Sequence, residues 1–288
     1  MEPITVKDPT TYEEQLNKLM VRGCSIDDPD FCTNVLSRVS YYRLSAYFLP
    51  YKRKDNSYHS NISFEKIFRI YEFDRAVRDL VSSAVEEAEV NLRAKLSYHH
   101  AHKYGSLGYL DENTFSARHV HPEFIDRVTS AIRSNSTTPI VRHHMEKYGG
   151  LFPLWVIIEL FTFGMLSYFF ADLKKSDQNV LSQLISGSTS LNALSWLRCC
   201  TDLRNMCAHY GRLYYRIFPA IPASLPPALK ASERRLFGAI WALRHLYPDS
   251  NKWRQEVIYP LSLLITEYET DIDLQHIGFP EEWESLLR

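Results

Sequence analysis

The chain has 288 residues, of which 45% are hydrophobic and 13% aromatic, so it can bury a large core and is not a disordered protein. Its 33 Lys and Arg against 34 Asp and Glu give a net charge of −1, so nucleic acid could bind only at a local basic patch. Five cysteines without regular spacing do not indicate a secreted disulfide framework. From the first residues we expect no secretion signal, and we expect a cytoplasmic protein without a cofactor.

Helix signals recur in the first part of the chain. Thr11 and Glu14 form a capping box, and Asp30 can cap a second helix. An aromatic-rich stretch follows at residues 40–51. These signals predict a small helical N-terminal subdomain over residues 1–60.

The longest helical pattern begins at Ser63 and keeps apolar residues at three- and four-residue spacing down to Tyr104 and Gly105. Further helices are expected from Pro122, from Pro139 to Gly149, from Pro153, from Ser190 to near Gly211, over residues 229–247, and from Ser250 to a kink or end at Pro260. Residues 212–218 could be extended, but no segment shows sustained alternation of the kind that strands need. The predicted fold is therefore all-α, with a helical domain over residues 61–288.

An apolar run at residues 151–171 contains one charge, Glu159, and is long enough to span a bilayer. Pro153 and Gly164 dilute the run, and a charge near the centre of a span is costly. We interpret the run as a buried helix and expect no membrane association. A membrane-acting toxin is the alternative that this segment leaves open.

A local basic patch lies at the end of the helix that begins near Ser190. Its charged residues are Arg198, Asp202, Arg204, Arg212 and Arg216, four positive and one negative, for a local charge of +3. Arg204 suits phosphate oxygens, His209 suits proton transfer near neutral pH, and Asn205 can orient a neighbour. Arg204 and His209 are about 140° apart around a helix axis, so both can border a cleft only if the helix end points into it.

A structural role for these residues is the alternative. In that interpretation, Arg204 pairs with Asp202 or Glu159, and His209 caps the carbonyl groups of its helix. Tyr42 and Arg43 have a similar ambiguity, since they could contact RNA bases or pack the N-terminal subdomain against the bundle.

Several segments together resemble the Abi-like abortive-infection family of bacteria, whose members are similar to HEPN domains. They are SYYRLSAYFLPY (40–51), residues 71–105, PLWVIIELFTFGMLSYFF (153–170), WLRCCTDLRNMCAHYGRLYYR (196–216) and GFPEEWESLL (278–287). The stretch from Arg204 to His209 fits the HEPN pattern of Arg, a polar residue, variable positions and His. The resemblance runs from about residue 10 to the C-terminus. It implies a HEPN-like helical bundle, a homodimer and a metal-independent endoribonuclease in phage defence.

The implied chemistry is attack of the RNA 2′-OH on the adjacent phosphate, with Arg204, Asn205 and His209 as the catalytic residues. One imidazole does not readily serve as both acid and base, and a two-fold dimer would supply two copies of His209 and of Arg204. The expected RNA contacts are Arg198, Arg212, Arg216, Tyr42 and Arg43, and Glu89, Arg93 and Glu159 could line the cleft behind Arg204. The alternative function is a dimeric RNA-binding protein that holds a structured small non-coding RNA without cleaving it.

The sequence predicts no metal site. His99 and His102 lie three residues apart on one helix, but no acid or cysteine completes a set nearby. Cys199 and Cys200 point about 100° apart, and Cys207 is expected in the core, so these thiols and His209 do not form a zinc set.

Overall fold

The computed structural model describes residues 8–59 and 61–288, and in these residues the chain is all-α, as predicted, with no strand beyond isolated bridges. The α-helices are α1 (Tyr12–Val21), α2 (Pro29–Arg38), α3 (Tyr41–Ser45), α4 (Phe64–Tyr104), α5 (His121–Ser134), α6 (Pro139–Tyr148), α7 (Leu154–Ile157), α8 (Phe163–Asp172), α9 (Lys175–Ser186), α10 (Ser190–Ala208), α11 (Leu236–Leu246), α12 (Ser250–Trp253), α13 (Tyr259–Glu267) and α14 (Trp283–Leu287). Short 3₁₀ segments join them at η1 (Ala46–Tyr51), η2 (Gly108–Leu110), η3 (Glu112–Thr114), η4 (Ile158–Leu160), η5 (Pro227–Ser232) and η7 (Leu274–Ile277), and η6 (Arg254–Ile258) is a π-helix.

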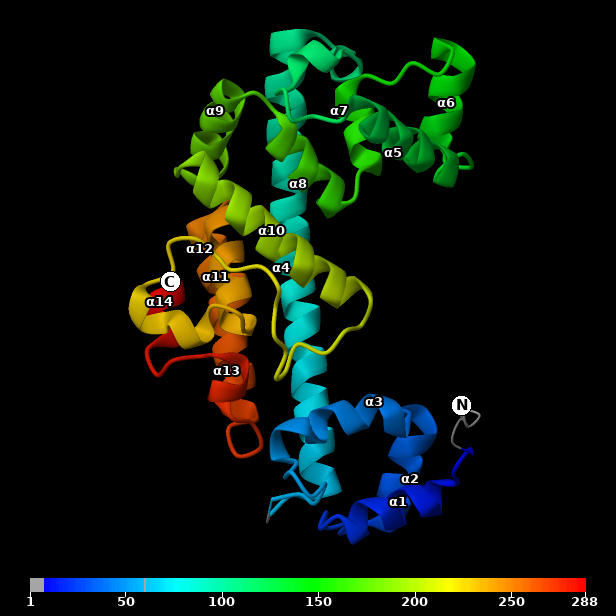
Figure 1. Ribbon diagram of the computed structural model, residues 1–288, viewed down its shortest axis with the longest axis vertical. Helices are drawn as coiled ribbons and strands as arrows, with labels where there is room; N and C mark the ends of the chain where they lie inside the picture. Colours follow the sequence, from blue (N-terminus) through cyan, green and yellow to red (C-terminus); the bar gives the residue numbers. More distant parts are fainter. Residues whose placement is uncertain (1–7, 60) are drawn as a thin grey trace, which may run out of the picture.

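The 41-residue helix α4 is the axis of the molecule (Figure 1). The Ser63 side chain caps its first turn by accepting from the backbone N–H of Lys66, and Gly105, with φ +87°, ends it. Both bounds are those that the sequence predicts. At 1.5 Å per residue the helix is about 60 Å long, so separate groups of helices can pack along it.

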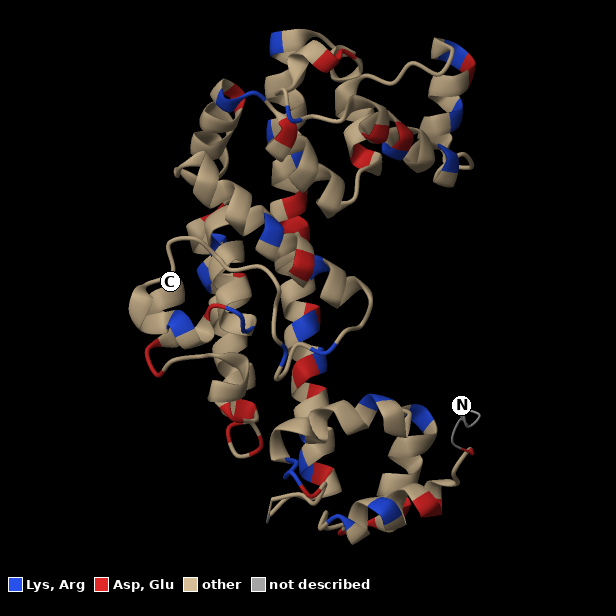
Figure 2. Cartoon of the chain, viewed as in Figure 1, with Lys and Arg blue, Asp and Glu red and all other residues tan. Residues whose placement is uncertain are grey.

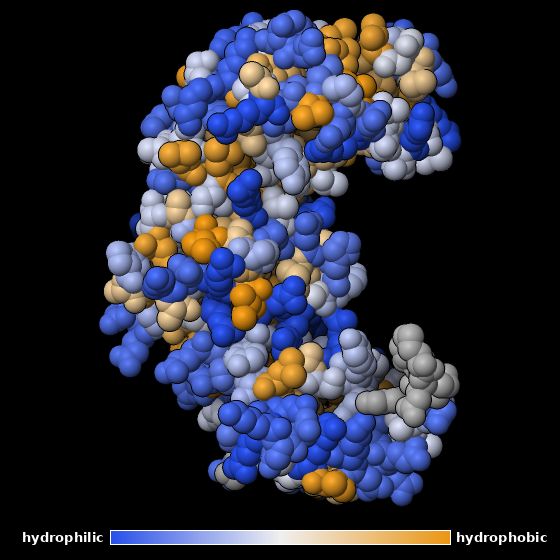
Figure 3. All heavy atoms as spheres, in the orientation of Figure 1, coloured by the Kyte–Doolittle hydropathy of each residue, from blue (hydrophilic) through white to orange (hydrophobic). Residues whose placement is uncertain are grey.

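Those groups give the molecule the outline of a C. Helices α1–α3 lie beside the first turns of α4, and α10 and α11 pack along its middle (Figure 1). Helices α7, α8 and α9 pack near its far end, from which α5 and α6 extend as an arm. The surface is hollowed between the N-terminal helices and the arm that holds α5 and α6 (Figure 3). The C-terminal end of α10 and the loop that follows it point towards this hollow (Figure 1).

The apolar run at residues 151–171 is not one helix, contrary to the prediction. Helix α7 passes into η4 after Ile157, Phe161 is extended, and the Thr162 side chain caps α8 by accepting from the N–H of Met165. The break lets Phe161 enter the core, where it is 1% exposed. In the described part of the chain, no helix is both long enough and apolar enough to cross a membrane.

The capping box of Thr11 and Glu14 is present as predicted, with both reciprocal hydrogen bonds. Three other predicted caps are displaced by one or two residues: the caps are Asp28, Thr189 and Asp249 instead of Asp30, Ser190 and Ser250. A cap must accept from an N–H two or three residues ahead, and each of these side chains does so.

The C-terminal part differs from the prediction at two places. The helix expected over 229–247 is divided into η5 and α11. Pro260 does not end its helix: the π-helix η6 lies directly before it, and α13 continues through it to Glu267. A proline has no backbone N–H to donate to the carbonyl four residues before it, and its ring crowds that carbonyl. The wider turn of a π-helix accommodates both effects.

Candidate functional site

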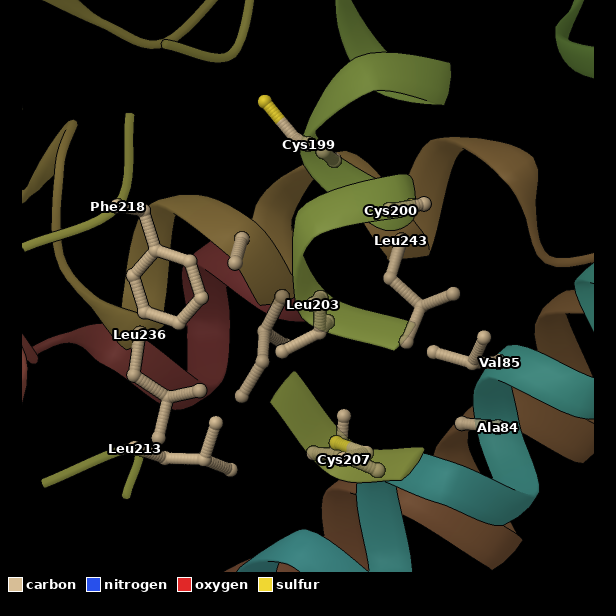
Figure 4. Packing of buried hydrophobic residues seen from close by; sticks show 14 of the residues in the cluster. Ala84, Val85, Cys199, Cys200, Leu203, Cys207, Leu213, Phe218, Leu236 and Leu243 are labelled. Carbon is tan, nitrogen blue, oxygen red and sulfur yellow. The ribbon is translucent and has the colours of Figure 1, made fainter. Parts of the chain in front are cut away.

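Helix α10 presents two different faces at its C-terminal end. Its buried side chains, including Cys200, Leu203 and Cys207, pack against α4 and α11 (Figure 4). Because Leu203 and Cys207 are fixed in the core, Arg204 lies at the border with α4, and Asn205 is exposed to solvent. Asn205 and His209 are four residues apart, so they follow the same exposed side of the helix.

The helix ends at the candidate motif in a Schellman arrangement. The N–H of Gly211 donates to the Met206 carbonyl (2.7 Å), and the N–H of Tyr210 donates to the Cys207 carbonyl (3.0 Å). Tyr210 takes the left-handed conformation, φ +53°, which usually favours glycine. The helix therefore ends at Ala208, slightly before the predicted stop at Gly211, and His209 is its C-cap residue.

His209 is exposed, and in the described residues its imidazole makes no hydrogen bond. Only its backbone N–H is engaged, donating to the Asn205 carbonyl at 3.1 Å. The side-chain cap that the structural alternative requires is absent from this part of the chain. The imidazole is thus accessible for proton transfer.

Arg204 is held by an acid on α4. Its Nε lies 3.7 Å from Oε2 of Glu89, and Oε1 of Glu89 accepts from the guanidinium of Arg93. Arg93 also donates to the Phe161 carbonyl (2.6 Å) and lies 3.7 Å from Glu159. The group expected behind Arg204 is therefore present. Neither pairing suggested by the structural alternative occurs, because the acid that contacts Arg204 is Glu89.

Asp202 is occupied elsewhere. Its Oδ2 accepts from the backbone N–H of Ala220 (3.2 Å), and burial raises the pKa of its carboxyl. It therefore anchors the loop after the motif and leaves Arg204 free of a second acid on the same helix.

A small hollow of about 260 Å³ lies between α4 and the end of α10. It is lined by Ser82, Val85, Glu86, Glu89, Arg204, Cys207 and Ala208. The Arg204 side chain is 34% exposed there, so a ligand from solvent can reach it. Asn205 and His209 do not line this hollow; they lie on the exposed side of the same helix end.

A buried carboxylate positions the loop that follows His209. Asp74 accepts from Tyr47 (2.7 Å) and Arg78 (2.9 Å) with one oxygen, and from the backbone N–H groups of Leu213 (2.9 Å) and Tyr214 (2.6 Å) with the other. Burial raises the pKa of the Asp74 carboxyl, while Arg78 and the hydrogen bonds oppose that shift.

Arg78 extends this anchor by donating to the Gly211 carbonyl (3.0 Å). Asp74 was not among the residues expected at the site; its sequence signal is an acid among the apolar, core-facing positions of α4. The anchor fixes the backbone directly after the motif, so Tyr210 and Gly211 cannot drift away from the end of α10.

Comparison with known protein families shows to which family the chain belongs. The model of the family described as Abi-like protein matches residues 34–215, more than half of the chain. The chain belongs to the Abi-like protein family. The match includes α3, α4 and the whole motif but not residues 278–287, so it is shorter than the resemblance predicts. No curated protein and no solved structure gives a significant match.

Membership places this Abi-like chain among proteins of abortive-infection defence. Within the matched region, two of the arginines expected to contact RNA also connect the N-terminal helices to the motif loop. Arg43 donates to the Tyr210 carbonyl, and Arg212 donates to the Ala46 carbonyl and lies over the ring of Tyr47, 5.9 Å from its centroid. Burial lowers the pKa of Arg212.

The other expected RNA contacts of the Abi-like chain are open to solvent. Tyr42 is 87% exposed and lies beside Arg43, so α3 presents it near the motif loop. Arg216 is exposed on the loop itself. Arg198 borders a separate hollow on α10, which it shares with Tyr168 and Asp202. In Figure 2, basic positions of α10 lie close to acidic positions of α4 where the two helices cross.

The cysteines of the Abi-like chain are buried and free. Burial raises the pKa of Cys199 to about 12 and that of Cys207 to about 11, so these thiols act as small core residues. His99 contacts Asp177 (2.8 Å), and His102 contacts the Tyr98 carbonyl (2.8 Å). Among the described residues, no three His, Cys, Asp or Glu side chains group as metal ligands.

Proposed function

We propose that this chain is a HEPN-type endoribonuclease that cleaves RNA without a metal ion. The observation that carries the proposal is the end of α10, where Arg204 is accessible in a hollow and His209 stands free on the adjoining exposed side. Both belong to the same helix end, and the Asp74 anchor fixes the loop beyond them.

The side chains suit the steps of 2′-OH attack. Arg204 stabilises the developing charge on the phosphate, and Glu89 holds its guanidinium in the hollow. His209 exchanges a proton with the attacking or leaving oxygen. Asn205, on the same exposed side, orients the RNA or the imidazole. The second proton-transfer group comes from a second copy of the chain.

Charge and stacking groups support an RNA path along this end of the molecule. Arg216 is exposed on the loop after the motif. Tyr42 also has an exposed ring, and it lies near the motif because its neighbour Arg43 donates to the Tyr210 carbonyl. Tyr42 can stack a base next to the cleaved bond, a contact that adds about 1–3 kcal/mol per base.

The test is cleavage of labelled RNA by purified protein in excess EDTA. We expect 2′,3′-cyclic phosphate and 5′-OH ends, and a loss of rate of about 10²–10⁴-fold in His209→Ala and a comparable loss in Arg204→Ala. His143→Ala and Arg254→Ala are matched controls, since both residues are exposed and distant in sequence from the motif.

Activity that disappears in EDTA and returns with magnesium or zinc would overturn the metal-independent mechanism. RNA that binds tightly but stays intact would favour the alternative function, a protein that holds a structured RNA. The first outcome concerns the chemistry and the second concerns whether this member cleaves at all.

A further inference from the structure

A second hollow, of about 340 Å³, lies between α8, α10 and the loop that follows the motif. We call it the α8–α10 hollow; the side chains used below are Arg198, Thr201 and Asp202 of α10, Ser167 and Tyr168 of α8, and Ala220 of the loop. Its volume falls in the range of about 300–1,000 Å³ that is usual for small-ligand sites.

The hollow opens on the side of α10 that leads to the candidate site. That side carries, at four-, three- and four-residue spacing, Arg198, Asp202, Asn205 and His209. These residues lie within about 60° of one another around the helix axis, and Asp202 is about 10 Å before His209 along it. A stacked strand advances about 3.4 Å per nucleotide, so the hollow is about three nucleotides from a phosphate held at His209.

Two opposite charges in the hollow have no partner. Among the described residues, Arg198 and Asp202 form no ion pair, although they are one turn apart on α10. Oδ2 of Asp202 accepts from the Ala220 N–H (3.2 Å), whereas no donor in the described chain contacts Oδ1. Burial raises the pKa of the Asp202 carboxyl more than this hydrogen bond lowers it, so further donors would stabilise its charge. The hollow therefore suits a ligand with both N–H donors and a negative group.

The α8 side of the hollow adds a hydroxyl group and an aromatic ring. Ser167 is 8% exposed, and its hydroxyl has no hydrogen-bond partner in the described chain. The ring of Tyr168 is 60% exposed. Arg127 lies over this ring from outside the hollow, 5.3 Å from its centroid, and helps to hold it in place. An aromatic ring beside polar groups is the combination that binds the face and the edge of an unpaired nucleobase.

Guanine fits the free carboxylate best among the four RNA bases. Its Watson–Crick edge presents two neighbouring donors, N1–H and the N2 amino group, which a carboxylate can accept together. Adenine and cytosine present a donor beside an acceptor, and uracil presents a donor between two acceptors. Each of those bases would therefore place an acceptor against Asp202. The O6 atom of guanine can accept from the Ser167 hydroxyl, and a phosphate suits Arg198.

We propose that the α8–α10 hollow is a guanine subsite that selects where the RNA is cut. Asp202 accepts from the Watson–Crick edge of the base, Tyr168 stacks on its face, and Arg198 contacts its phosphate. The placement of this guanine in an RNA strand rests on the proposed function, because it requires the cleaved phosphate at His209. The strand follows the exposed side of α10 from the hollow to His209.

The first experiment measures binding without cleavage. The probes are fluorescent 2′-fluoro hexanucleotides, which have no attacking 2′-OH; each carries one G, A or C in a uridine background, and a uridine-only oligomer is the reference. By fluorescence anisotropy in EDTA, the wild type should bind the G oligomer about 10–100-fold more tightly than the others. Equal affinity for all four oligomers would overturn the proposal.

Asp202→Asn separates base recognition from the anchoring of the loop. The amide oxygen can still accept from Ala220, but the NH₂ group puts a donor where guanine needs an acceptor. The preference for G should fall by about 10-fold or more. Asp30→Asn is the matched control, since this carboxylate is exposed on α2, and it should keep the preference. A folded Asp202→Asn protein that retains the preference would overturn the proposal.

Tyr168→Leu tests the stacking contact separately. It should weaken the binding of every oligomer by about 10-fold and keep their order, because stacking on an aromatic ring tolerates any base. Tyr259→Leu is the matched control, because Tyr259 is 62% exposed on α13 and lies outside the hollow. Unchanged affinity in Tyr168→Leu would show that no base enters the hollow.

Competition with free GMP distinguishes an RNA subsite from a site for a free nucleotide. GMP should displace the G oligomer only at a concentration at least about 10-fold higher than the unlabelled oligomer requires, because it lacks the neighbouring phosphates. GMP that competes as well as the oligomer would overturn the RNA subsite.

Sequencing of the ends of cleaved RNA tests the link to the reaction. A guanine should occur at one fixed position within about three nucleotides of the cut, and this preference should disappear in Asp202→Asn. Cleavage without such a guanine would overturn the subsite and spare the proposed function. If the wild type cleaves no RNA, the proposed function fails, while the binding measurements still decide whether the hollow holds guanine.

Discussion

Replacing Asp74 with Asn is the sharpest test of how the fold holds the candidate site. The Asp74 side chain is 1% exposed and that of Arg78 is 5% exposed, so the pair has almost no contact with water. In Asp74→Asn the amide oxygen can still accept from the N–H groups of Leu213 and Tyr214. The amide NH₂ group then faces Arg78 and Tyr47, so a donor replaces the acceptor that both require.

The main cost is the uncompensated charge of Arg78. Removing one partner of a buried ion pair costs about 3–5 kcal/mol. That is a large part of the total stability of about 5–15 kcal/mol expected for a folded protein. At about 2–4 °C per kcal/mol for a chain of this size class, the melting temperature should fall by about 6–20 °C.

The assay is urea unfolding at pH 7.5, followed by far-UV circular dichroism and compared through the midpoint and slope. Asp126→Asn is the matched control, since this carboxylate on α5 is exposed, and it should stay within about 0.5 kcal/mol of wild type. Adding Arg78→Met to Asp74→Asn should recover part of the loss, because the unpaired charge is then gone. An Asp74→Asn variant within about 1 kcal/mol of wild type would refute the reasoning.

Three further predictions concern the site and the core. His209→Ala should leave the free energy of unfolding within about 0.5 kcal/mol of wild type while cleavage falls by about 10²–10⁴-fold, because the imidazole makes no contact that folding needs; an unfolded variant would show a structural role. Glu89→Gln should tighten RNA binding and steepen its salt dependence, because it removes a negative charge from the hollow. The same variant should lower kcat, because Arg204 loses the carboxylate that holds its guanidinium. Binding and kcat equal to those of the wild type would contradict the role of Glu89. Burial lowers the pKa of His100 to about 4, so this residue should make stability fall by about 1.4 kcal/mol per pH unit as the pH drops from about 6.5 to 4. Burial lowers the pKa of His245 to about 4 as well, so His100→Phe should reduce, and not abolish, the slope of stability measured by urea unfolding across this range.

The sequence alone determined the features that depend on neighbouring residues. The bounds of α4 follow from Ser63, which accepts the N–H of Lys66 three residues ahead, and from Gly105, which takes a positive φ. The end of α6 at Gly149, with φ +59°, follows from the same local chemistry. The spacing of Arg204 and His209 on one helix end was equally readable, because helix geometry fixes it within two turns.

Only the tertiary structure decided what faces that helix end. Glu89 contacts Arg204, and Asp74 accepts from Leu213 and Tyr214, and in both cases the partners are more than a hundred residues apart in sequence. The break in the apolar run at residues 158–162 has the same origin, since burying Phe161 against the core outweighs the helix that the run could form by itself. Caps and periodicity act within a turn or two of the chain, whereas pairing between distant segments depends on how whole helices pack.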